Sequence, residues 1–232
     1  MVKVTVVLPT YNEKDNIVEL INRLTKVLND YELIVVDDDS PDLTWKIVKD
    51  LKRKNVRSIR RVGERGIASA IGRGIKEAKG DYVVWMDCDM SMPPEKVPML
   101  IKKLDLGADI TIGSRYVKGG KDSRPKIRQI TSYLFNIYTQ LVLGHGVKDY
   151  DSGFIAVKSK VFKSFKFPAY GYGEYFIEFV YKAAKKGFKI VEVGYNNIDR
   201  IKGESKTAEN IFVLFKYGIQ YGIKVIKLRL TK

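Results

Sequence analysis

The residues YVVWMDCDMS, numbers 82–91, join an apolar run to two carboxylates that stand one residue apart. The run 82–86 predicts a buried strand, because β-branched and aromatic residues favour strands. Asp87 and Asp89 follow at once, although neighbouring like charges repel and their desolvation is costly unless something compensates it. Two interpretations are open from these residues alone: a solvated turn, or a site for a divalent cation that needs both carboxylates.

Strand and helix patterns alternate along the chain around this stretch. Strands are expected over residues 4–8, 33–36, 56–59, 82–86, 109–112, 154–158 and 190–193. Helices are expected over residues 17–28, 45–54, 67–78, 126–143 and 174–186, and after Pro93 and Pro94. Asn12 is expected to cap the first helix, and Gly72 and Gly74 to let the third approach the sheet closely. Such alternation predicts an α/β fold with a mostly parallel central sheet flanked by helices.

Acidic residues follow two of the predicted strands. Asp37, Asp38 and Asp39 come after the second strand, as Asp87 and Asp89 come after the fourth. Because ligands of parallel sheets bind beyond the carboxyl ends of the strands, both clusters are expected on the same rim. This favours the metal interpretation, with Mg²⁺ or Mn²⁺ as hard cations that prefer oxygen ligands. The sequence has neither a GxGxxG nor a Walker-type loop.

Composition limits the class of protein. The 232 residues are 45% hydrophobic and 30% charged, as in ordinary globular chains. Cys88 is the single cysteine, which excludes an intramolecular disulfide and suits a reducing compartment. The net charge of +15 indicates an anionic partner: nucleic acid, an acidic membrane surface or a phosphate-rich substrate. A lysine-rich surface for thermal tolerance is a fourth interpretation.

The tail of the chain carries an amphipathic pattern. Residues 211–230 are mostly apolar and long enough to span a bilayer. Lys216, Gln220, Lys224 and Lys227 recur at intervals of four, four and three, however, which places polar groups along one helix face. We therefore expect a helix that packs on the core or lies in a membrane interface. Further upstream, residues 119–125 are the best candidate for a mobile loop.

Six motifs occur in an order typical of one enzyme family. They are PTYNE (9–13), VVDDDSPD (35–42), MDCDMSMPPE (86–95), GSRYVKGG (113–120), DYDSGF (149–154) and IDRIKGESK (198–206). Together they resemble the dolichyl-phosphate mannose synthases, within the inverting family 2 glycosyltransferases of GT-A fold. The final motif is the most specific and points to the polyprenyl-phosphate branch. The resemblance implies a catalytic domain over residues 1–206 and an amphipathic C-terminal helix over residues 207–232.

The resemblance also implies roles for particular residues. For the donor nucleotide it implies contacts from Pro9, Tyr11, Glu13, Asp37 and Asp39. For the donor's diphosphate it implies a Mg²⁺ or Mn²⁺ ion on Asp87, Asp89 and Ser91, with Arg115, Arg200 and Lys206 as cationic partners. For the acceptor's phosphate it implies Arg128, Ser132, Asn136 and Ser152. Catalysis would then rest on Asp89, Arg115, Arg128, Arg200 and Lys206.

Two departures from the family pattern bear on these roles. Ser91 stands where the family commonly has a glutamine that can serve the metal, and Thr207 stands where a leucine often follows GESK. The first departure leaves open whether serine or water supplies the third ligand.

The expected chemistry needs no general base. A phosphate monoester has its second pKa near 6 and is already a nucleophilic oxyanion at neutral pH, whereas a hydroxyl acceptor needs a base. Glu174 and Glu178 are the remaining candidates for a base, and His145 is expected to be a loop residue. We therefore expect cations to position two mutually repelling phosphates.

The resulting hypothesis is transfer of one sugar, with inversion and metal assistance, from GDP-mannose to a polyprenyl or dolichyl phosphate. An alternative keeps the reaction and replaces the donor with UDP-glucose or another nucleotide sugar. A nucleic-acid-binding module is a third reading, disfavoured because carboxylates line the expected cleft. Nucleic acid is therefore not expected as a partner, and the chain is expected to be cytoplasmic, peripherally bound to the cytoplasmic face of a membrane.

Overall fold

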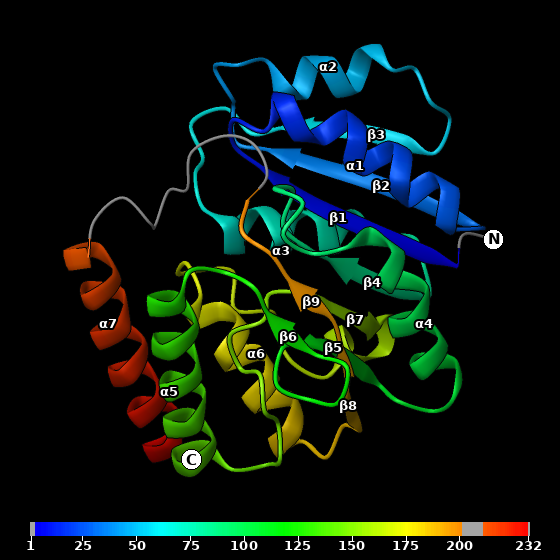
Figure 1. Cartoon of the computed structure of the whole chain (residues 1–232). Helices are drawn as coiled ribbons and strands as arrows, with labels where there is room; N and C mark the ends of the chain where they lie inside the picture. Colours follow the sequence, from blue (N-terminus) through cyan, green and yellow to red (C-terminus); the bar gives the residue numbers. More distant parts are fainter. Residues whose placement is uncertain (1–2, 201–210, 232) are drawn as a thin grey trace.

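A seven-stranded sheet forms the centre of the computed structural model, which describes residues 3–200 and 211–231 (Figure 1). Its strands are ordered β3-β2-β1-β4-β7-β5-β8. They are β1 (Val4–Thr10), β2 (Tyr31–Asp37), β3 (Val56–Arg60), β4 (Tyr82–Trp85), β5 (Ile110–Ser114), β7 (Ile155–Lys158) and β8 (Ile190–Gly194). The helices are α1 (Lys14–Val27), α2 (Thr44–Asp50), α3 (Ile67–Glu77), α4 (Val97–Asp105), α5 (Lys126–Leu143), α6 (Glu174–Lys185) and α7 (Ile211–Leu230), with 3₁₀ turns at Pro94–Lys96 and Ser159–Lys163.

The pairing of the strands confirms a mostly parallel sheet. β1 lies between β2 and β4 and runs parallel to both, with Val7 opposite Ile34 on one side and Trp85 on the other. β2 and β3 are also parallel, as are β5 and β8. β7 runs antiparallel to its neighbours β4 and β5. The carboxyl ends of β1, β2 and β4 therefore meet at one edge, where the acidic residues follow.

Both faces of the sheet are covered by helices, as expected for buried parallel strands (Figure 1). Alternate residues of β1 point to opposite faces: Val6 and Leu8 pack with α1 and α4, whereas Val7 packs with α3 and α6. The sequence alternation thus builds two cores, one on each side of the same strands.

Two local predictions were wrong. Asn12 does not cap α1: it has a left-handed backbone (φ 57°), and Glu13 occupies the cap position. The segment expected to be a mobile loop contains β6 (Lys121–Asp122), which pairs in parallel with β9 (Asn196–Asn197). A Cβ at Gly120 would lie 2.5 Å from the carbonyl oxygen of Ser114, so this glycine permits the close approach.

The tail helix α7 lies along α5 and also contacts α6 (Figure 1). Val225 and Leu228 are buried in the core of that side. Lys224 turns inward, where it forms an ion pair with the buried carboxylate of Glu178 and donates to the hydroxyl of Tyr170 at 2.8 Å. Within residues 3–200 and 211–231, no helix has the length and apolarity needed to cross a bilayer.

Gly74→Ala should destabilise the protein by about 1–3 kcal/mol through overpacking. A Cβ at this position would lie 2.3 Å from Cγ1 of Val7, so α3 and β1 would have to separate. Gly222→Ala in α7 is the matched control, because a Cβ there meets nothing within 4 Å and alanine is favoured in helices by up to about 1 kcal/mol. Urea denaturation of both variants measures the difference, and equal stability of the two would contradict the proposed close approach.

Candidate active site

A cavity of about 930 Å³ opens at the carboxyl edge of the sheet. It is bounded by the ends of β1 and β4, by the first turns of α5 and by α7. The predicted site residues that line it are Pro9, Tyr11, Glu13, Asp87, Asp89, Ser91, Arg115, Arg128, Ser132, Ser152 and Arg200. Asp37, Asp39 and Asn136 lie outside its wall, and Lys206 and Thr207 lie outside the described residues. Residues that are up to 191 positions apart in the sequence thus share one cavity.

The acidic pair after β4 is short of positive charge. Burial, together with the carboxylates of Asp89 and Glu13, raises the pKa of Asp87 to about 7. Arg200 supplies one cation: its Nη2 lies 2.8 Å from Oε1 of Glu13 and its Nε lies 3.5 Å from Oδ2 of Asp89. One guanidinium therefore serves two carboxylates, and Asp87 has no ion pair among the described residues.

This donor set fits a Mg²⁺ or Mn²⁺ ion that substrate phosphates complete. The described residues contain no cluster of three or more His, Cys, Asp or Glu side chains suited to a metal. Mg²⁺, however, is commonly held by one or two carboxylates with phosphates and waters in the remaining positions. Ser91 lines the cavity and donates its backbone N–H to Oδ1 of Asp89 at 3.1 Å. Its role as a third metal ligand stays a prediction.

The three acids after β2 have different surroundings. Asp37 is fully buried behind the cavity wall, where it accepts hydrogen bonds from the Thr10 hydroxyl at 2.8 Å and from the backbone and side chain of Ser40 at 2.8 and 2.7 Å. These bonds make Asp37 a positioning residue for the turn, rather than a side chain that faces a donor. Asp39 instead pairs with Arg60 at 2.5 Å and lines a smaller hollow of about 290 Å³.

Asp38 is the acid of this run that lines the main cavity. Arg61, itself buried, donates to it through Nε at 2.8 Å, and the backbone N–H of Gly66 donates at 2.8 Å. Beside it the guanidinium of Arg65 lies 4.3 Å from the ring centroid of Tyr11 and donates to its hydroxyl. The aromatic ring and guanidinium provide flat, polarisable surfaces of the kind on which a nucleobase stacks.

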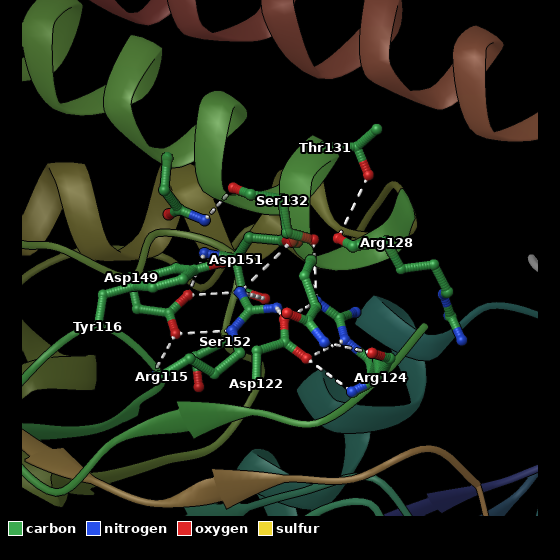
Figure 2. Close-up of polar contacts among 12 residues, drawn as sticks. Arg115, Tyr116, Asp122, Arg124, Arg128, Thr131, Ser132, Asp149, Asp151 and Ser152 are labelled. Carbon is green, nitrogen blue, oxygen red and sulfur yellow. Dashed lines mark hydrogen bonds and ion pairs between the residues drawn. The ribbon is translucent and has the colours of Figure 1, made fainter. Parts of the chain in front are cut away.

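Arg115 is held from several sides (Figure 2). Its Nε and Nη2 donate to the two oxygens of Asp149 at 2.9 and 2.6 Å, and its backbone N–H donates to the same carboxylate at 2.9 Å. Carboxylate oxygens of Asp151 and Asp122 lie 3.6 and 3.8 Å from it. Its side chain is 2% exposed, so Arg115 fixes the DYDSGF turn against the end of β5, and its predicted contact with a donor stays a prediction.

The predicted acceptor residues differ in how far they reach the cavity. The Arg128 side chain extends away from the Arg115 cluster (Figure 2) and pairs with Asp199 at 3.0 Å. Ser132 accepts from Arg124 at 3.0 Å, and Ser152 donates to the carbonyl oxygen of Gly113. Asn136 is buried and accepts from the backbone N–H of Tyr150 at 2.7 Å. It therefore positions the turn from α5 without facing the cavity.

Sequence reasoning missed several residues that build this site. They are Arg61, Arg65, Arg124 and Asp149, while Asp38 belongs to the predicted acidic run but received no individual role there. Arg124 could have been found, because residues 124, 128, 132 and 136 are polar and recur at intervals of four. Arg61 gave no such signal, since its partner is 23 residues away, and the DYDSGF motif contains Asp149 but does not reveal its partner Arg115, 34 residues away.

The layered sheet and its acidic carboxyl edge are those of the GT-A glycosyltransferase fold. Glucosyl-3-phosphoglycerate synthase from Mycobacterium tuberculosis, solved with Mn²⁺, UDP and glucosyl-3-phosphoglycerate, superposes with a TM-score of 0.74 at 19% identity, over 97% of this chain and 79% of that one. The family model described as glycosyl transferase family 2 matches residues 5–165. The chain belongs to this family, which confirms the fold and the family that the motifs predicted.

Two curated relatives carry more specific names. The dolichol-phosphate mannosyltransferase of Pyrococcus furiosus is 42% identical over 210 residues, which are 88% of this chain and 59% of that protein. The polyprenol monophosphomannose synthase of Mycolicibacterium smegmatis is 31% identical over 229 residues, 93% of this chain and 86% of that protein. The chain thus spans less than two thirds of the length of the first relative and most of the second.

Asp149→Asn should destabilise the protein by about 3 kcal/mol or more, because it leaves the buried Arg115 without its bidentate partner. Glu95→Gln is the matched control. Glu95 accepts the same bidentate pair of bonds from Arg23, at 2.7 and 2.6 Å, but is about half exposed, and such surface pairs contribute roughly 1 kcal/mol or less. Denaturant unfolding compares the two, and a loss no larger than that of Glu95→Gln would contradict the assigned role of Asp149.

Proposed function

We propose that this protein transfers one sugar, with inversion, from a nucleotide diphosphate sugar to a polyprenyl phosphate. The observation that carries the proposal is the continuity of the cavity. Its lining combines the charged side chains of Asp87, Asp89 and Arg200 with apolar side chains of α5 and α7, including Phe135 and Ile219. Such a cavity suits one ligand that is highly charged and a second that joins a phosphate to a hydrocarbon chain.

The position of the acids supports a phosphate nucleophile. Neither candidate for a general base lines the cavity. Glu178 is occupied by Lys182, Lys224 and Tyr170, and Glu174 accepts from the backbone N–H groups of Tyr172 and Gly173 at 2.8 and 3.1 Å. His145 packs edge-on against Tyr181, also away from the cavity. A phosphate monoester needs no such base, because it is already an anion at neutral pH.

We propose roles for the charged groups nearest the expected reaction. Asp87 and Asp89 would hold Mg²⁺ or Mn²⁺, which neutralises charge on a departing diphosphate. Arg200 lies beside this pair and is suited to hold the donor's phosphates, since its guanidinium can bind oxyanions in a bidentate manner. Arg128 and Ser132 line the same cavity from α5 and would orient the acceptor.

For the donor we propose GDP-mannose, with the mannosyltransferase names of the two relatives as support. The stacked pair of Tyr11 and Arg65 and the acid Asp38 provide a surface for a base and a ribose. UDP-glucose and other nucleotide sugars remain outcomes of the experiment, because these contacts are compatible with more than one base.

The purified protein should move label from radioactive GDP-mannose, and not from UDP-glucose, into an organic extract when Mn²⁺ and a short polyprenyl phosphate are present. Asp89→Asn should reduce the rate at least about a hundredfold, since several kcal/mol of charge stabilisation would be lost. Asp81→Asn, at the opposite end of β4, is the matched control and should retain activity. Label that appears only with UDP-glucose would contradict GDP-mannose as the donor. Full activity of Asp89→Asn, or of the wild type in excess chelator, would contradict a role for the metal.

We further propose that the protein works at the cytoplasmic face of a membrane, where the reducing environment suits the single free Cys88. Large apolar side chains are exposed along α5 and α7: Ile127, Ile130, Tyr133, Leu134, Ile137 and Leu141 on α5, and Ile219, Ile223, Ile226 and Leu230 on α7. The two helices pack side by side (Figure 1), so these residues belong to neighbouring elements that also border the cavity. A lipid acceptor could then enter the cavity directly from the bilayer.

Leu134→Glu together with Leu141→Glu should weaken binding to vesicles at least about tenfold while leaving the fold intact, because both side chains are more than half exposed. Leu106→Glu is the matched control: this leucine is 66% exposed but follows α4, on the other side of the sheet. Co-sedimentation with vesicles that contain acidic lipid measures binding. Equal binding of the double variant and the wild type would contradict a membrane-facing role for α5.

A further inference from the structure

Arg124 lies just before α5, between β6 and the helix that carries the predicted acceptor residues (Figure 2). Its Nε and Nη2 donate to the two oxygens of Asp122 at 2.9 and 2.6 Å. Nη2 also donates to the hydroxyl of Ser132 at 3.0 Å, and the carbonyl oxygen of Arg124 accepts from the Gln129 side chain at 2.6 Å. The side chain is thus fixed in one place by two elements.

The surroundings of Arg124 divide into a buried side and a cavity side. Asp122 is 7% exposed and does not line the cavity, so it holds the guanidinium from behind. Although burial opposes it, the pairing with Arg124 lowers the pKa of Asp122 and keeps it charged. Arg124 itself lines the cavity, and within residues 3–200 its Nη1 makes no hydrogen bond. Arg124 therefore reaches the cavity while its Nη1 is not used by these residues.

Ser132 adds a second donor at the same place. Its oxygen accepts from Arg124, so its own hydroxyl proton is available for an oxygen atom in the cavity. The two N–H groups of Nη1 and the hydroxyl of Ser132, held together in this way, can donate to separate oxygens of one phosphate, an anion that guanidinium groups bind strongly.

The other arginines of this wall are engaged differently. Arg115 is 2% exposed and fully committed to Asp149, with Asp122 and Asp151 nearby. Arg128 is paired with Asp199, whose carboxylate is about half exposed, so water screens that pair. Arg124, with 14% of its side chain exposed, is held firmly and yet reaches the cavity. Arg124 is thus held in place by hydrogen bonds, as Arg115 is, and it lines the accessible cavity, as Arg128 does.

We propose that Arg124 binds the phosphate of the lipid acceptor together with Ser132, and that Asp122 positions Arg124 for this contact. The ligand class is a phosphate monoester attached to a hydrocarbon chain. The inference rests on the proposed function for the identity of that ligand, but it concerns binding and can be measured without turnover.

Farnesyl phosphate is the probe, titrated into the full chain by calorimetry. Arg124→Gln should weaken its binding about tenfold to a hundredfold, the range for a lost charge-assisted hydrogen bond. Arg124→Lys should fall in between, because lysine keeps the charge but loses the planar fork. Arg23→Gln is the matched control, since Arg23 makes the same bidentate bonds to Glu95 far from the cavity. Farnesol, which lacks the phosphate, should bind all variants alike.

Binding of GDP separates the acceptor's phosphate from the donor's. It should stay within about twofold of wild type in Arg124→Gln, which also shows that the variant is folded. The inference would be overturned if Arg124→Gln kept the wild-type affinity for farnesyl phosphate or lost affinity for GDP instead. It would also be overturned if Arg124→Gln lost as much affinity for farnesol as for farnesyl phosphate, or if the wild type did not bind farnesyl phosphate. The protein could also bind farnesyl phosphate in a manner that depends on Arg124 and yet transfer no sugar to lipid. That result would refute the proposed function but would support the phosphate site.

Discussion

Repulsion among carboxylates at one edge of a parallel sheet is the constraint around which this structure is arranged. Parallel strands bring the ends of β1, β2 and β4 together, and Glu13, Asp38 and Asp87 come with them. Charged groups that leave water need partners, because desolvation otherwise favours their neutral forms. The chain supplies arginines from distant segments: Arg61 for Asp38 and Arg200 for Glu13. Asp87 lacks an ion pair among the described residues, and a divalent cation would supply the missing positive charge.

The sequence predicted the elements of this fold more fully than their connections. Short apolar and β-branched stretches located the strands 82–86 and 190–193, and apolar residues at helical spacing located the helix over Lys126–Leu143. These patterns could not give the antiparallel direction of β7, since Ile155–Lys158 is buried on both faces whichever way it runs. Acids at strand ends were likewise readable, but the burial of Asp37 and the exposure of Asp39 depend on a turn in which Asp39 has a left-handed backbone. Pairs such as Arg115 and Asp149 are set by packing, which residue spacing does not encode.

The helices α5 and α7 connect the charged part of the molecule to its apolar exterior. Ser132 and Arg128 face the cavity from α5, while Ile130 and Leu134 of the same helix face outward. α7 is kept beside it by Lys224, which reaches the buried Glu178 on α6. A buried charge of this kind contributes specificity of placement more than net stability. The tail helix is therefore fixed in register against α6 while Ile219, Ile223 and Ile226 stay exposed on it.

The short pair β6–β9 connects two segments that line the cavity, the loop after β4 and the start of α5. The backbone N–H of Ile198, next to β9, donates to the carbonyl oxygen of Ser91 at 3.2 Å, and that of Ser123, next to β6, donates to Asn197 at 2.7 Å. This ribbon thus ties the loop of Asp89 to the residues that lead into α5. Thermodynamic linkage makes any coupling through this ribbon reciprocal: two ligands that each bias its position change each other's affinity by the same factor. Four paired residues therefore join the loop of Asp89 and the start of α5 in one hydrogen-bonded unit.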